Sequence, residues 1–381
     1  MEWRSSGAAP GARPLVAEEA TFGPARGRMA EQVRAGVWAT LVVALLVAAI
    51  VVGSRNLEAF DAALTVYTFA VVFATWGIVY HYSIWLQKPP TRMFWRRGWQ
   101  LAARRGYLRS AAGLARVAVT HLALQTFIAP RSWLRWTAHQ LLFWGCLLAV
   151  AITFPLVFGW VQFTASLHDQ MVYDAWLFGF KMQSFPIRTL FSWLLFHGLD
   201  FAAVLVLAGL SLFLWRRMRD KGAQALQTGY DFVPLLLLFA ISVTGLALTA
   251  STLWLRGALY PFIAILHALT VVIGLIYLPF GKFFHIFQRP AQLGVKLYQE
   301  AGAAGPQARC ARCGQEYASQ MHVDDLKLVL TQLGFDYRLP APEERSDAGR
   351  AVAGHWVELC PTCKRRSLAA AQLRLQESAR G

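Results

Sequence analysis

The stretch Ala258–Phe287 is the last long apolar run of the chain and reads ALYPFIAILHALTVVIGLIYLPFGKFFHIF. It contains two histidines, His267 and His285, which are 18 residues apart. Eighteen residues make five turns at about 3.6 residues per turn, so a continuous α-helix would carry both imidazoles on one face. With a rise of about 1.5 Å per residue, the two rings would be roughly 27 Å apart along the axis, close to the thickness of the hydrocarbon core of a bilayer. Such a helix would place one histidine near each membrane surface.

The composition indicates a helical membrane protein that crosses the bilayer several times. Of the 381 residues, 56% are hydrophobic and only 15% are charged, which gives a mean hydropathy of +0.40. The formal net charge of +16 could indicate a nucleic-acid-binding protein. The basic residues, however, cluster beside the apolar runs, as they do in membrane proteins, and this placement argues against nucleic acid as a partner.

Six membrane spans are expected, and together they form the helical bundle predicted for residues 35–287. Their approximate ranges are 35–53, 62–87, 137–163, 188–214, 231–255 and 258–287. Residues 1–34 have no periodic apolar pattern and are expected to form a mobile cytoplasmic tail. The fold class is therefore an all-α, six-helix transmembrane bundle.

The segment 88–136 contains ten Lys and Arg residues and no Asp or Glu. Its Trp, Phe and Leu residues alternate with arginine at helical spacing, which is typical of a helix that lies among lipid headgroups. Positive charge marks the cytoplasmic side, so this segment and the basic run Arg216–Lys221 are expected there. With six spans, both termini are then cytoplasmic as well.

The histidines of the spans can be paired by their expected depth. An imidazole inside a membrane is costly without a partner, and two at opposite depths favour axial ligation of two stacked b haems over hydrogen-bonded structural histidines. His139 begins the third span at the cytoplasmic end and matches His285. His197 of the fourth span matches His267 near the outer surface. His81, near the cytoplasmic end of the second span, competes for the inner pair.

Four cysteines near the C-terminus form two CxxC pairs. Cys310 and Cys313 lie in CARCG, and Cys360 and Cys363 lie in CPTCK. Four thiolates at this spacing predict a tetrahedral zinc or a single iron ion. Residues 288–381 are therefore expected to form a small cytoplasmic metal-binding domain of the zinc-ribbon or rubredoxin-like kind. Its insert HVDDLKLVLTQLGFDY has apolar residues at helical spacing and predicts an amphipathic helix. Zinc would make the domain a docking element, whereas iron would make it an electron carrier.

Three segments resemble a known family. The motif WTAHQLLFWG at 136–145, the span DFAAVLVLAG at 200–209 and the sequence VTGL at 243–246 accompany the terminal helix with two histidines. Together they resemble the membrane cytochrome b subunit of respiratory nitrate reductase, over about residues 66–288. The same superfamily includes the membrane subunits of sulfite-reductase-linked and heterodisulfide-reductase-like complexes.

The resemblance implies a function and a set of ligands. In this superfamily, five core helices hold two b haems, which carry electrons between quinone and an iron–sulfur and a catalytic subunit in a complex of the bacterial or archaeal cytoplasmic membrane. By motif, His139 and His285 match the ligands of the haem nearer the cytoplasm, and His267 matches one ligand of the outer haem. The family has a further histidine ten residues after the first, where this chain has Ala149. Either His197 replaces it, or the outer haem is altered or absent.

Two other functions remain open. One is a haem-free membrane anchor whose zinc ribbon docks partner subunits, which predicts a colourless protein that tolerates changes at His139 and His285. The other is a secondary transporter, which calls for inverted repeats and broken helices in corresponding positions. The sequence has no clear repeat of that kind. The favoured reading is an electron-transfer subunit with no catalytic centre of its own beyond quinone chemistry.

Overall fold

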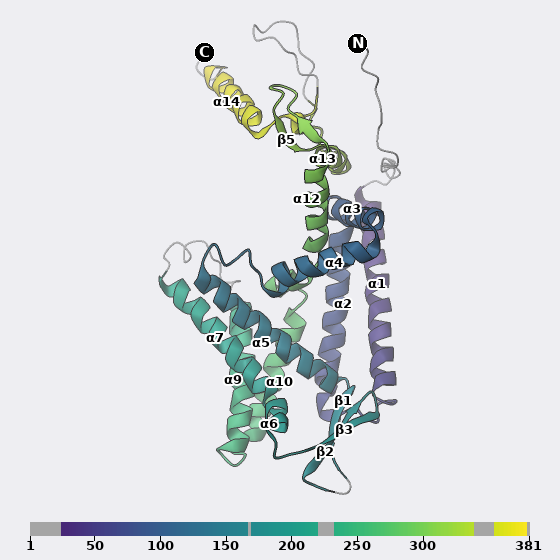
Figure 1. Cartoon of the computed structure of the whole chain (residues 1–381), viewed down its shortest axis with the longest axis vertical. Coiled ribbons are helices and arrows are strands. Elements are labelled where there is room, and N and C mark those ends of the chain that lie inside the picture. The colour runs from purple at the N-terminus through teal and green to yellow at the C-terminus, as the bar shows by residue number, and fades with distance from the viewer. Residues whose placement is uncertain (1–23, 167–168, 220–231, 339–353, 379–381) are drawn as a thin grey trace. The chain divides into compact units, whose positions relative to one another are not determined.

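The computed structural model describes residues 24–166, 169–219, 232–338 and 354–378. Within these ranges the chain has six helices that are long and apolar enough to cross a membrane, as the hydropathy pattern predicts (Figure 1). They are α1 (Pro24–Gly53), α2 (Thr65–Gln87, preceded by the single turn η1, Ala62–Leu64), α5 (Trp133–Val157), α7 (Gly198–Arg219), α9 (Phe232–Leu253) and α10 (Tyr260–Tyr277).

The chain forms two compact units. One is Ala35–Ala301, which holds the helical bundle, and the other contains Gly302–Gly381. The boundary differs from the expected one after residue 287, because α12 (Gln292–Ala304) begins in the bundle unit. There α12 packs on α3 (Pro89–Arg105): Tyr298 contacts Phe94 at 5.1 Å between ring centroids, and Glu300 forms an ion pair with Arg105 at 3.3 Å.

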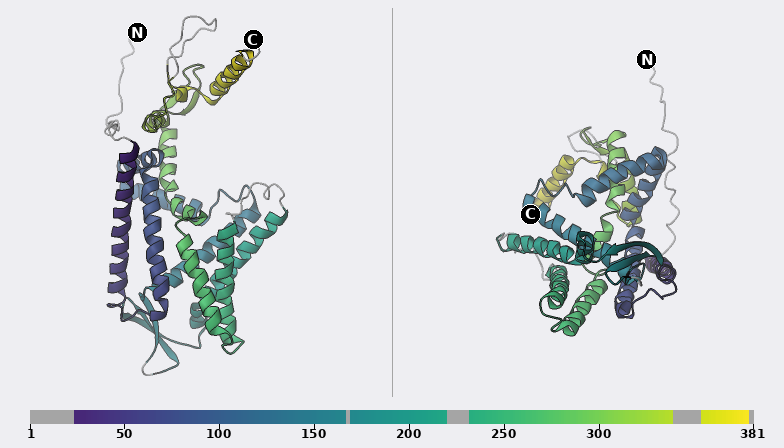
Figure 2. Two further views of the ribbon diagram at one scale, coloured as in Figure 1. Left: turned by 180° about the vertical axis from the view of Figure 1, so that it is seen from behind. Right: turned by 60° about the horizontal axis from the view of Figure 1, so that its bottom comes forward.

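The bundle is held together by successive helix pairs. Helix α5 packs on α7, α7 on α9, α9 on α10, and α10 on α2. Figure 2 shows α1 alongside α2, and the indole nitrogen of Trp76 on α2 donates a hydrogen bond to the Thr40 hydroxyl on α1 at 3.4 Å. Small residues allow the closest approach, between α5 and α7. A Cβ atom at Gly145 would lie 2.9 Å from the Ala202 carbonyl oxygen, and one at Gly209 would lie 2.9 Å from that of Ala138. Both glycines belong to the motifs that carry the family resemblance. Glycine at these two positions lets the backbones of α5 and α7 approach closely.

We expect Gly145→Ala to destabilise the bundle by about 1–3 kcal/mol, because its added methyl group meets backbone that must move. The measurement is the thermal unfolding midpoint of the protein in detergent. Gly36→Ala on α1 is the matched control, because a Cβ atom there meets nothing within 4 Å. An unchanged midpoint for Gly145→Ala would contradict the close packing of α5 on α7.

The last apolar stretch is not one continuous helix, and this prediction is wrong. Helix α10 ends at Tyr277, and a turn leads to the 3₁₀ turn η4 (Lys282–Phe284) and the short helix α11 (His285–Gln288). The interruption follows from Pro279, which has no N–H to donate to a helix and whose ring opposes helical continuation. Pro279 instead packs on α2, where a Cβ atom at Gly77 would lie 2.8 Å from it. The whole-turn spacing of His267 and His285 therefore does not determine where their rings point.

The fourth span is also interrupted. A separate helix α6 (Leu190–Phe196) precedes α7, and His197 is the residue that ends α6. The sequence-based range 188–214 placed His197 well inside a span. In the structure His197 lies at the junction of α6 and α7, and its depth match to His267 stays a prediction.

The link between α5 and α6 folds into a small antiparallel sheet, which the sequence analysis did not predict. Its strands are β1 (Val161–Ala165), β2 (Val172–Leu177) and β3 (Phe180–Pro186), in the order β1-β2-β3. One face gathers aromatic rings, with Phe185 buried against Phe163 and Tyr173. Figure 1 shows the sheet at the end of the bundle opposite to α3 and α4 (Tyr107–Ala118).

The arginine-rich segment forms helices, as expected. Helices α3 and α4 are followed by one turn of π-helix, η2 (Val119–Ala123). Large side chains such as Trp95, Trp99 and Leu108 are exposed on α3 and α4, while Met93 and Ala102 are buried. Exposed aromatic residues among arginines are typical of a helix at a membrane surface, and that location stays a prediction.

Candidate functional site

The four cysteines lie on two turns of the C-terminal unit. Strands β4 (Gln307–Arg309) and β5 (Glu316–Ser319) pair as a hairpin, and its loop contains Cys310 and Cys313. Gly314 closes this loop with a positive φ of 75°, a conformation that glycine adopts without strain, and its N–H donates to the Cys310 carbonyl at 2.9 Å. The turn η5 (Trp356–Glu358) leads to Cys360, and Cys363 lies in the first turn of α14 (Pro361–Ser378).

The two turns bring the four thiols together. All four sulfur atoms lie within 4.8 Å of one another, and the Sγ atoms of Cys313 and Cys360 are 3.7 Å apart. A tetrahedral zinc with Zn–S bonds of about 2.3 Å requires sulfur–sulfur distances of about 3.8 Å. Cys313 is exposed, whereas Cys310, Cys360 and Cys363 are buried. The predicted four-cysteine group is therefore assembled, and its donor atoms and spacing fit one metal ion.

Backbone N–H groups prepare part of this cluster for ionisation. The N–H of Cys360 donates to the Cys310 sulfur at 3.3 Å, and that of Cys363 donates to the Cys360 sulfur at 3.4 Å. Burial opposes ionisation of Cys310, but the hydrogen bonds outweigh it and lower the pKa of this thiol to about 6. Burial and the neighbouring sulfur atoms raise the pKa of Cys363 to about 12. A bound cation is what would allow all four thiols to ionise together.

A small core supports the two cysteine turns. The amphipathic helix predicted in the insert is present as α13 (Gln320–Gln332). Its Val323 side chain packs in a buried cluster with Ala308 of β4 and Val357 of η5. Lys327 on the same helix forms an ion pair of 2.6 Å with Glu358, two residues before Cys360. Helix α13 thus connects the first cysteine turn to the second.

Two of the predicted haem ligands lie within electrostatic range of each other in the bundle unit. His139 on α5 and His285 on α11 are close enough to interact electrostatically, and Arg289 also acts on His139. The Nδ1 atom of His285 is hydrogen-bonded to the Lys282 carbonyl oxygen. A carbonyl only accepts, so Nδ1 carries the proton and Nε2 has the free lone pair. Histidines that bind metals are commonly oriented by such a bond from the other ring nitrogen.

His81 lies against the same turn. Its ring packs edge-on against Phe280 at 5.6 Å and against Phe284 at 6.0 Å between centroids. Phe284 directly precedes His285, and α2 contacts α11. His81 therefore borders the region of the inner pair and remains the competing ligand.

His267 is held by the VTGL sequence of α9. Its Nδ1 atom lies 2.9 Å from the Thr244 hydroxyl oxygen. Thr244 donates its own proton to the Ala240 carbonyl at 2.7 Å, so His267 Nδ1 is the donor and Nε2 has the free lone pair. Gly245 leaves room for the ring, since a Cβ atom there would lie 3.4 Å from His267 Cε1. Sequence reasoning did not predict that Thr244 would orient His267, although Thr244 belongs to the VTGL motif.

His197 has a separate set of contacts. Its ring stacks on Trp193 at 4.8 Å between centroids, and its Nδ1 donates to the Trp193 carbonyl at 2.9 Å. Trp193 belongs to α6. The structure thus places His139 and His285 within electrostatic range of each other and gives His197 and His267 different hydrogen-bond partners. Sequence reasoning also missed Arg289, although it lies one helical turn after His285.

In comparisons with known proteins, no family model, curated protein or solved structure matches this chain.

Proposed function

We propose that the chain is a multi-pass membrane subunit that binds b-type haem and transfers electrons between quinone and a partner oxidoreductase. The proposal rests on His139 and His285, which lie within electrostatic range of each other in the bundle unit. The two residues come from distant parts of the sequence, α5 and α11, and the family resemblance names the same two as the inner ligands. The hydrogen bond of His285 to the Lys282 carbonyl leaves Nε2 as its metal-binding nitrogen.

The surroundings of this pair suit a haem at the arginine-rich end. Two imidazoles would supply the axial ligands, and Phe280 and Phe284 provide apolar surface beside them. The positive charge of Arg289 acts on His139 and would attract the negatively charged propionate of a haem bound there. When bound, the haem iron would accept and release single electrons. The location follows the expectation of a cytoplasmic membrane with the arginine-rich end and both termini inside.

The outer haem has weaker support than the inner one. His267 is oriented by Thr244 with its Nε2 available, as a ligand would be. The family position for its partner is Ala149, and His197 lies at the end of α6 with its ring on Trp193. The proposal therefore centres on one inner haem. A second haem would need an axial ligand from elsewhere, because Ala149 stands where the family has a histidine.

We assign the four-cysteine group to a structural zinc. Zinc takes four cysteine thiolates in a closed tetrahedral site, and two short turns are its usual setting. In that role the C-terminal unit would dock the iron–sulfur and catalytic subunits. Iron in the same site would instead add an electron carrier. A haem-free anchor is the second candidate function, favoured by the fact that the cysteine group is complete while the outer histidine pair is not.

Addition of a quinol to the purified protein tests the electron-transfer role. We expect the quinol to reduce a substantial part of the haem that dithionite reduces, and an oxidised quinone added in excess to reoxidise it. The absorption spectrum of the haem follows both steps. Haem that dithionite reduces and no quinol reduces would contradict a role in quinone chemistry while leaving haem binding intact.

A further inference from the structure

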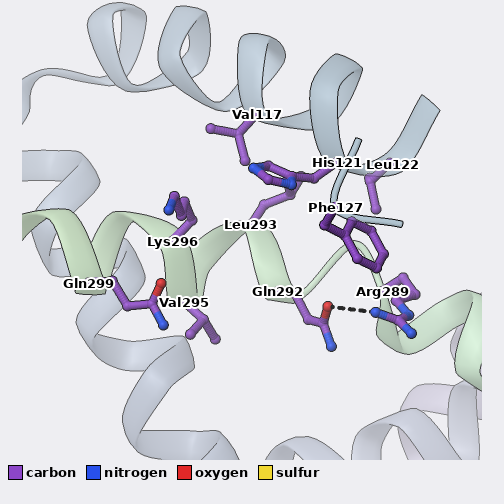
Figure 3. Close-up of a pocket in the computed structure, with 10 residues that line it drawn as sticks. All are labelled: Val117, His121, Leu122, Phe127, Arg289, Gln292, Leu293, Val295, Lys296 and Gln299. Atoms are coloured by element: carbon purple, nitrogen blue, oxygen red, sulfur yellow. Dashed lines mark hydrogen bonds between the residues drawn. The ribbon is translucent and has the colours of Figure 1, made fainter. Parts of the chain in front are cut away.

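A cavity of about 450 Å³ lies between the π-helical turn η2 and α12, within the bundle unit (Figure 3). This volume falls in the range of small-molecule sites. One wall comes from the end of α4, η2 and the loop that follows, and the other comes from Arg289 and α12. Ten residues line it, among them His121, Phe127, Arg289, Leu293 and Lys296.

The lining combines positive charge with apolar surface. Arg289 and Lys296 are cationic, and none of the ten lining residues is acidic. The nearest carboxylate along α12 is Glu300, one turn after Lys296, and it forms an ion pair with Arg105 at 3.3 Å. The cavity thus keeps a net positive charge beside Leu293 and its other aliphatic residues.

Side chains from both walls reach into the space between them. Figure 3 shows His121 reaching from η2 toward Leu293 on α12, with Phe127 beside Arg289. The Arg289 guanidinium lies 5.8 Å from the centre of the Phe127 ring and donates a hydrogen bond to the Gln292 side chain at 3.3 Å. These contacts hold the cation at the cavity instead of leaving it free in solvent.

The end of α4 shapes one wall of the cavity. The helix finishes in a π-turn, a conformation that occurs at helix C-termini. Here the turn follows directly on α4 and carries both His121 and Leu122, so the irregular backbone is the part that shapes the wall.

We propose that this cavity binds the phosphate headgroup of an anionic phospholipid, with the upper part of the acyl chains on its aliphatic wall. Basic pockets beside membrane helices on the cytoplasmic side are suited to such headgroups. The segment 88–136, which supplies one wall, carries ten basic residues and no acidic one, so its charge selects anionic over zwitterionic lipid. Exposed Trp95 and Trp99 on α3 are of the kind that anchors a helix at that depth. The inference rests on the membrane insertion in the proposed function. It shares Arg289 with the surroundings of the proposed inner haem, whereas Lys296 belongs to the cavity alone.

Native mass spectrometry of the full chain, purified in detergent and stripped of lipid, tests this site. The probes are phosphatidylglycerol and phosphatidylcholine with the same acyl chains. We expect one phosphatidylglycerol to bind in preference to phosphatidylcholine. The double variant Arg289→Gln with Lys296→Gln should weaken binding of phosphatidylglycerol about 30-fold, and Lys296→Gln alone about fivefold.

The matched control is the double variant Arg131→Gln with Arg135→Gln. It removes the same charge from two exposed residues of the same basic segment that do not line the cavity. We expect it to change the affinity less than about threefold, because exposed charges away from the site are screened. Equal affinity for the two lipids, equal losses in the two double variants, or displacement of the lipid by inorganic phosphate would each overturn the proposal. The readout is the mass of bound lipid, so the result does not depend on haem. A protein without haem can still confirm the lipid site, and a protein with haem can still contradict it.

Discussion

His139→Ala and His285→Ala are each expected to remove the inner haem, lowering its content per chain more than about tenfold. Each substitution deletes one of the two axial ligands, and changes to residues that merely orient a ligand already cost about ten- to a hundredfold in metal affinity. Neither change should unfold the bundle, because α5 is held by its packing on α7 at Gly145 and α11 is a single short turn. The measurement is haem content by pyridine haemochrome on protein purified in detergent, with the thermal midpoint as a check of folding.

Three further variants make this result specific. The His81→Ala variant should keep the inner haem. If His81→Ala instead loses the inner haem while His139→Ala keeps it, His81 is the ligand in place of His139. His267→Ala should affect only an outer haem. His322→Ala, in the C-terminal unit, controls for the removal of a histidine elsewhere. Full haem content in both His139→Ala and His285→Ala would contradict the proposed inner pair.

Cys310→Ser and Cys360→Ser are expected to lose the bound metal, from about one ion per chain to less than a tenth of that. Structural zinc contributes on the order of 10 kcal/mol or more to the folding of small four-ligand domains, and removal of one thiolate opens a closed site. Among the described residues of the C-terminal unit, the buried cluster of Ala308, Val323 and Val357 is small, so we expect the metal to contribute much of the unit's stability. Metal analysis of the full-length protein measures the loss, and limited proteolysis of residues 302–381 measures the unfolding.

Cys146→Ser is the matched control for the cysteine variants. Cys146 lies on α5 and is not part of the four-cysteine group, so its variant should keep the metal. Zinc and iron are told apart by the metal analysis itself, and iron would also give the unit a visible absorption. Loss of metal in Cys146→Ser to the same extent, or no metal in the wild type purified without chelator, would contradict the assignment.

Hydropathy and cysteine spacing predicted much of this structure. The six long apolar helices and the helix α13 were expected, because burial of apolar surface follows periodic patterns that the sequence displays directly. The two CxxC turns were expected for a similar reason, since each needs only its own few residues and a partner turn. The helical nature of the arginine-rich segment followed from its aromatic periodicity.

The errors arose where a helix is interrupted. Pro279 interrupts the terminal stretch, so the five-turn spacing of His267 and His285 did not predict a common face. A second break, at His197, separates α6 from α7. The small sheet was missed because its strands mix polar and aromatic residues and are stabilised by one another.

Depth along a span was therefore an incomplete guide to pairing. It paired His139 with His285, and in the structure the charge of His285 acts on His139. That the two share a haem stays a prediction. It also named His197 with His267, which have different partners. The contact between two helices depends on tertiary packing, and hydropathy contains no information about which helices are neighbours.

The most direct test of the central claim is a dithionite-reduced minus oxidised absorption spectrum of the wild-type protein, purified in detergent with its native partners. Our account predicts the absorption bands of a reduced b-type haem, at no less than one haem per chain by pyridine haemochrome. A colourless protein that retains its metal and its partners would contradict the account and would favour a haem-free membrane anchor.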